Sequence, residues 1–115
     1  MGEGLSIYRS AVENAVEYIE ENLKKIVKVE DVSNYVRMSY FHFHRIFFAT
    51  TGETLGDYIR KRRLTQAACE LLNTNNRIID IALDYQFESQ AAFSRSFKSV
   101  YGIMPGTFRK RALQP

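Results

Sequence analysis

Two segments of the chain carry the same residues at the same spacing, and each segment holds one arginine among phenylalanines. The matched residues lie 50 positions apart: Ser39, Phe43, Arg45, Phe47 and Gly52 in the first copy, and Ser89, Phe93, Arg95, Phe97 and Gly102 in the second. An arginine side chain presents five N–H donors on a permanent positive charge, which suits carboxylates and phosphates. The repeat therefore predicts two similar sites for a negatively charged partner.

Helical spacing divides each copy into two faces. The phenylalanines are spaced four apart and should pack inward, flanked by Ile46 and Val100. The opposite faces then hold the candidate binding residues: Phe41, His44, Arg45 and Phe48 in the first copy, and Gln90, Ala91, Ser94, Arg95 and Lys98 in the second. Arginine can bond both guanine acceptors, glutamine can pair with adenine, and Phe or Ala can touch a thymine methyl. This set predicts base reading on DNA, with solvent-facing salt bridges as the alternative for both arginines.

Other reactive residues do not form a recognisable site. His42 and His44 are two apart, so they point to different sides of a helix, and no second His or Cys cluster completes a metal site. No nucleophile motif or cofactor fingerprint is present, so neither an enzyme nor a cofactor is expected. Cys69 lies among Ala67, Ala68, Leu71 and Leu72 and is interpreted as a buried core thiol.

The charge is distributed unevenly. Residues 1–35 hold four Lys and Arg against seven Asp and Glu, whereas residues 36–115 hold twelve against six. A basic region that contains the repeat favours nucleic acid as the partner, and a solvated basic face is the alternative. The basic runs 60–63 and 109–111 are interpreted either as phosphate contacts or as solvated charge.

The sequence predicts seven helices and no strand. Ser39 and Ser89 are good N-caps, and Gly52 and Gly102 are suited to end the same helices. The expected elements are an amphipathic helix between residues 7 and 23, short helices over 29–36 and 78–85, longer helices over 39–51 and 89–101, a long connector helix over 54–73 with Thr54 in a capping box, and a brief helix from Pro105.

A short helix, a turn and a longer helix occur in both halves, which is the order of a helix-turn-helix motif. Upstream of the turn the copies are offset by 49 residues rather than 50, so the second turn has one extra residue. We expect one domain over 1–115, with the first helix-turn-helix subdomain at 6–52, the connector at 54–73 and the second subdomain at 76–111. The chain has no long apolar run and no signal-peptide pattern, so a cytoplasmic location is expected.

The run from Ile81 to Lys98, followed by Gly102-Ile-Met-Pro-Gly-Thr-Phe-Arg109, resembles the signature of AraC/XylS transcription regulators. The resemblance covers about residues 6 to 111. It implies an all-α, seven-helix bundle of two helix-turn-helix subdomains joined by a long connector helix. It also implies binding of adjacent major-groove segments of double-stranded promoter DNA, regulation of transcription by activation, and recruitment of RNA polymerase. No sensing or effector domain is recognisable in these 115 residues.

Three positions depart from the family pattern. Gln86 stands where the turn of the second motif usually has glycine, and a positive φ there would cost on the order of 1 kcal/mol. Met104 and Phe108 replace the usual serine and tyrosine near the last helix, which removes a cap and a hydroxyl. Apart from the resemblance, two other interpretations fit the sequence: a helical protein-interaction module and a nonspecific nucleic-acid binder.

Overall fold

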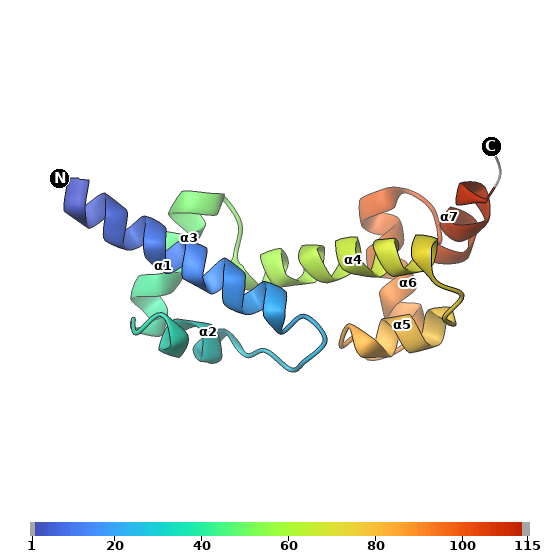
Figure 1. Ribbon diagram of the computed structural model, residues 1–115, viewed down its shortest axis with the longest axis horizontal. Coiled ribbons are helices and arrows are strands. Elements are labelled where there is room, and N and C mark those ends of the chain that lie inside the picture. The colour runs from blue at the N-terminus through green and yellow to red at the C-terminus, as the bar shows by residue number, and fades with distance from the viewer. Residues whose placement is uncertain (1, 114–115) are drawn as a thin grey trace. The chain divides into compact units, whose positions relative to one another are not determined.

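A computed structural model describes residues 2–113, which form seven α-helices and no strand (Figure 1). The predicted all-α fold with seven helices is confirmed, and residues 1, 114 and 115 of the expected domain lie outside the described part. The helices are α1 (Gly2–Glu21), α2 (Val29–Tyr35), α3 (Tyr40–Thr51), α4 (Leu55–Asn73), α5 (Ile78–Asp84), α6 (Gln90–Tyr101) and α7 (Pro105–Ala112). None of the described helices combines the length and apolar character that a membrane crossing needs.

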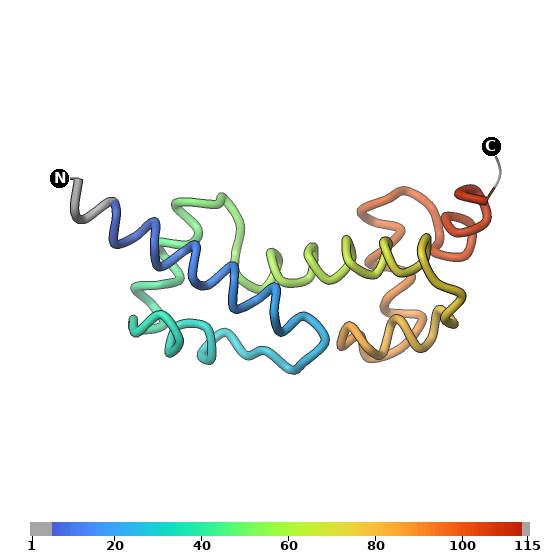
Figure 2. Tube along the Cα trace, in the orientation of Figure 1, coloured from blue at the N-terminus to red at the C-terminus, as the bar shows by residue number. Residues whose placement is uncertain are grey.

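The chain divides into two compact units, residues 1–60 and 61–115, and the division falls inside α4. Figure 2 shows α4 as an unbroken helix through this point. The hydroxyl of Thr54 accepts a hydrogen bond from the Asp57 backbone N–H at 3.2 Å, which caps the start of α4 as expected. Each unit therefore takes part of one continuous helix into its core.

The first unit packs α1, α2 and α3 around two phenylalanines. Phe43 and Phe47 have no exposed surface, and the Phe47 ring meets Tyr58 of α4 edge to face at 5.5 Å. The α1 stripe is buried from Ala11 onward, but Ile7, which the periodicity placed in the same stripe, is 62% exposed. That part of the prediction is wrong: the buried stripe of α1 begins at Ala11, one turn after Ile7.

The second unit also has two phenylalanines at its core, with α5 and α7 packed against α6. Phe93 and Phe97 are fully buried, and the Phe97 ring lies 5.2 Å from that of Phe108 on α7. Tyr85 is also buried, and its hydroxyl donates a hydrogen bond to Oε1 of Glu70 at 3.2 Å. Burial, with a smaller contribution from the Glu70 carboxylate, raises the pKa of Tyr85 to about 12.

Two expected core residues lie on the surface instead. Val100 is 50% exposed; it lies three residues beyond the buried Phe97 and is the second-last residue of α6. Cys69 is also exposed. Buried positions of α4 recur at Leu64, Ala67, Ala68 and Leu71, and residue 69 falls about 100° beyond this stripe. Its apolar neighbours in sequence belong to a different face of the helix.

Candidate nucleic-acid interface

The first helix-turn-helix consists of α2, a tight turn and α3. The turn closes α2 with a Schellman motif, in which the Arg37 N–H donates to the carbonyl of Asn34 at 3.1 Å and the Met38 N–H donates to that of Ser33 at 3.0 Å. This motif requires a left-handed residue, and Arg37 has φ = 60°. α3 begins at Tyr40, three residues after Arg37.

The second helix-turn-helix ends its shorter helix, α5, with the same Schellman motif, and the segment that leads to α6 has the one extra residue that the sequence predicted. The Gln86 N–H donates to the carbonyl of Leu83 and the Phe87 N–H to that of Ala82, both at 3.0 Å. Gln86 has φ = 68°, so the position that usually carries glycine keeps its left-handed conformation here. The positive φ that the sequence analysis considered for Gln86 is therefore present, and Arg37 has a positive φ at the same point of the first motif.

Serine caps set the start of both longer helices, and glycines set the end. The Ser39 hydroxyl accepts a hydrogen bond from the His42 N–H at 3.3 Å, and that of Ser89 accepts one from the Ala92 N–H at 3.0 Å. Gly52 and Gly102 are left-handed, with φ of 78° and 82°. Both predicted recognition helices therefore have the expected capped ends.

The outer face of α3 is aromatic as well as basic. Phe41 is 77% exposed, Arg45 is exposed and His44 is half-buried. The His44 ring stacks on Tyr40 at 5.8 Å between ring centres, so it is held in place by a neighbouring aromatic side chain. An exposed phenylalanine beside an arginine offers apolar contact and hydrogen bonding on one surface.

The outer face of α6 is polar and forms one side of a groove of about 810 Å³. Exposed Gln90, Ala91, Arg95 and Lys98 all line it, as predicted for the binding face. Ser94 also lines the groove but is only 7% exposed, which does not fit the open position that helical spacing indicated. Ser94 follows Phe93 directly, so it lies at the border between the two faces.

Two residues of this groove were missed from the sequence. Ser99 lies four residues after Arg95, so helical spacing could have placed it on the same face. Met104 lies beyond the end of α6, at the N-cap position of α7, and no periodic pattern points to it. Its side chain makes no cap hydrogen bond, in line with the loss of the usual serine.

Both recognition arginines are available for a partner. Neither Arg45 nor Arg95 forms an ion pair or a side-chain hydrogen bond with the described side chains, those of residues 6–113. The salt-bridge alternative considered for them is therefore not seen. A guanidinium with unused donors on an exposed helix face can bond carboxylate, phosphate or base acceptors.

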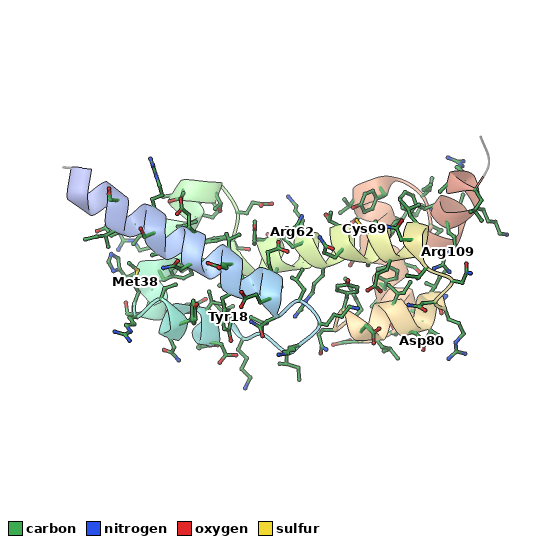
Figure 3. All side chains as sticks on the ribbon, viewed as in Figure 1. Tyr18, Met38, Arg62, Cys69, Asp80 and Arg109 are labelled. Atoms are coloured by element: carbon green, nitrogen blue, oxygen red, sulfur yellow. The ribbon has the colours of Figure 1, made fainter. Side chains whose placement is uncertain are left out.

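The other basic runs have partly structural roles. Arg60 pairs with Asp57 one turn earlier on α4 at 2.8 Å. Arg109 of α7 donates from Nε to the carbonyl of Leu71 at 2.9 Å and from Nη2 to that of Thr74 at 3.3 Å (Figure 3). These are carbonyls at the C-terminal end of α4, so Arg109 is neither solvated charge nor a simple phosphate contact.

Both histidine rings contact tyrosine rings. The His42 ring meets Tyr8 of α1 edge to face at 5.8 Å, and His44 stacks on Tyr40. In the part of the chain that the structure describes, no three His, Cys, Asp or Glu side chains lie close enough together to hold a metal ion.

Comparison with known sequences gives a family match. Residues 32–111 match a family model described as a helix-turn-helix domain. The chain is 50% identical over 102 residues to YbfP of Bacillus subtilis, an uncharacterised HTH-type transcriptional regulator; the match covers 89% of this chain but 35% of that protein. It is 40% identical over 100 residues to the HTH-type transcriptional activator AarP of Providencia stuartii, covering 87% of this chain and 74% of that protein.

Solved structures show the same fold. An AraC-type transcriptional regulator from Chromobacterium violaceum superimposes with a TM-score of 0.88 at 27% identity, covering 93% of this chain and 96% of that one. The DNA-binding domain of the global transcriptional factor AdpA, solved with a target DNA, superimposes with a TM-score of 0.83 at 25% identity over 90% and 96% of the two chains.

Proposed function

The chain belongs to the AraC family of helix-turn-helix transcription regulators, and from this premise we propose that α3 and α6 enter successive major grooves of one promoter site. The members of this family are DNA-binding proteins and not enzymes. In this proposal the chain acts as a single domain over residues 1–115, in which α4 connects the subdomains that hold the recognition helices α3 and α6. One chain would then read a non-palindromic site without forming a dimer.

The observation that carries this proposal is the pair of capped recognition helices, each with an exposed arginine that forms no ion pair with the side chains of residues 6–113. Arg45 and Arg95 occupy the same place in two motifs that also share the turn geometry. The two motifs place different side chains at equivalent outer positions. This favours recognition of a different base sequence by each motif over one nonspecific electrostatic contact.

Each candidate residue has a role in this proposal. Arg45 and Arg95 bond guanine, Gln90 pairs with adenine, and Phe41 and Ala91 contact thymine methyl groups. His44 supplies one hydrogen bond from a ring that Tyr40 holds in place. Lys98 lies one turn after Arg95 and neutralises a phosphate, and Ser94, which lines the same groove, offers a hydroxyl for a hydrogen bond.

Activation is the proposed outcome of binding. Relatives bear the names of activators, among them AarP, and a regulator that reads a promoter acts where RNA polymerase binds. We place the protein in the cytoplasm with its promoter and propose RNA polymerase as its protein partner.

Selection from random duplexes at two salt concentrations tests the proposal. We expect enrichment of a site of about 20 base pairs in two blocks, since half-sites lie about one helical turn apart. Salt-sensitive binding without enrichment would instead indicate a nonspecific nucleic-acid binder. If the chain bound no duplex at low salt, the result would contradict DNA binding and favour a protein-interaction module.

A further inference from the structure

A second groove, of about 800 Å³, lies in the first unit beside α3. Its walls come from α3, which contributes Arg45 and His42, and from the start of α1, which contributes Tyr8 and Arg9. The edge-to-face contact of Tyr8 with His42 at 5.8 Å joins the two walls. Two arginines from separate helices therefore line one open groove.

The charge of this groove differs from that of the rest of α1. Among the described residues that line it are two arginines and a histidine, but no Asp or Glu. Arg9 is the only basic residue of α1, and four glutamates follow it between residues 13 and 21. Among the side chains that the structure describes, those of residues 6–113, Arg9 like Arg45 has no ion pair or side-chain hydrogen bond. An acidic helix thus places its one cation beside the recognition helix.

We infer that Arg9 binds a phosphate of the DNA backbone next to the bases that Arg45 reads, so that α1 forms part of the DNA-binding surface. This inference rests on the proposed function. Phosphates flank every base edge in the major groove, and a guanidinium matches their geometry with two parallel hydrogen bonds. The contact fixes the register of α3 on the duplex and carries no sequence preference of its own.

The test compares Arg9→Ala, Arg9→Lys and Lys24→Ala. The last variant removes the same charge just beyond the other end of α1. Affinity for the selected duplex and for a scrambled duplex is measured by fluorescence anisotropy between 50 and 200 mM salt. Circular dichroism melts show whether each variant folds.

For Arg9→Ala we expect weaker binding to both duplexes by the same factor, and a slope of log affinity against log salt that is shallower by about 0.9. The ratio of wild-type affinity to Arg9→Ala affinity should then fall about 3.5-fold between 50 and 200 mM salt. Arg9→Lys should keep the wild-type slope, and Lys24→Ala should change neither affinity nor slope.

The inference is overturned if Arg9→Ala folds and binds like wild type, or if its affinity falls with no change in slope. An equal effect of Lys24→Ala would show that only net charge matters and would overturn it too. Failure of the wild-type chain to bind any duplex would instead overturn the proposed function itself.

Discussion

Arg37 and Gln86 adopt the same left-handed backbone conformation, with φ of 60° and 68°, at the same point of the two helix-turn-helix motifs. Each closes a Schellman motif at the end of the shorter helix and directs the chain into the recognition helix. Neither residue is glycine, so both turns contain a conformation that a side chain disfavours by about 1 kcal/mol. The geometry of the turn is kept despite this cost.

Arg37→Gly should therefore stabilise the protein. We expect a gain of up to about 1 kcal/mol in unfolding free energy, because glycine adopts a positive φ without strain. Urea unfolding measures it. Gly52→Ala is the matched control, since that glycine has φ = 78° and open space around it, and alanine there should cost about 1 kcal/mol. A loss of stability in Arg37→Gly would contradict the prediction, because it would show that the contacts of the Arg37 side chain stabilise the fold by more than its positive φ destabilises it.

Phe41 should read thymine through its methyl group. It is 77% exposed on α3, so its value in binding comes from apolar contact with DNA. Replacing the contacted thymine by uracil, which lacks the methyl, should weaken wild-type binding by about 1 kcal/mol or less, in line with one buried methyl group. The Phe41→Ala variant should not distinguish the two duplexes, and an equal uracil penalty in both proteins would contradict the assignment.

Arg109 should stabilise the fold and not the DNA complex. Its guanidinium satisfies carbonyls of Leu71 and Thr74, so Arg109→Met should cost about 1 to 3 kcal/mol of unfolding free energy. The slope of log affinity for DNA against log salt should stay at the wild-type value. Lys110→Met removes an exposed lysine next to Arg109 and is the comparison variant for the loss of stability. A shallower salt slope for Arg109→Met with unchanged stability would instead place Arg109 on a phosphate.

Tyr85 should make stability depend on alkaline pH. Its pKa is raised to about 12 in the folded protein, mainly by burial, against about 10 when unfolded. Folding thus favours the neutral phenol of Tyr85. The resulting contribution to the free energy of unfolding is complete below pH 10 and is lost between about pH 10 and 12. The stability difference between wild type and Tyr85→Phe should shrink over that range in urea unfolding. A constant difference would mean that Tyr85 titrates normally.

Local spacing was enough to predict the helices, their caps and the buried phenylalanines. The i, i+4 rows of α3 and α6 separate Phe43 and Phe93 from Arg45 and Arg95 without knowledge of the rest of the chain. Residue types also marked the ends, since serine and left-handed glycine satisfy helix termini.

Positions that depend on packing between helices were not predictable in this way. Ser94 is at the border of two faces, and its burial depends on how α6 packs against its neighbours. Arg109 donates a hydrogen bond to Leu71, and Arg9 lines a groove together with Arg45. In both cases the partner is more than 30 residues away in the sequence, so no local pattern indicates the contact. Cys69 was misassigned because its apolar neighbours in sequence lie on a different side of α4.

The central claim is that the two recognition helices read different parts of one site. The most direct test is to repeat the duplex selection with Arg45→Ala and with Arg95→Ala. Each variant should lose base preference at one position, with a cost of about 1 to 3 kcal/mol there, and the two positions should lie in different blocks. Loss of preference in the same block for both variants, or an equal loss of affinity on every sequence, would contradict the claim.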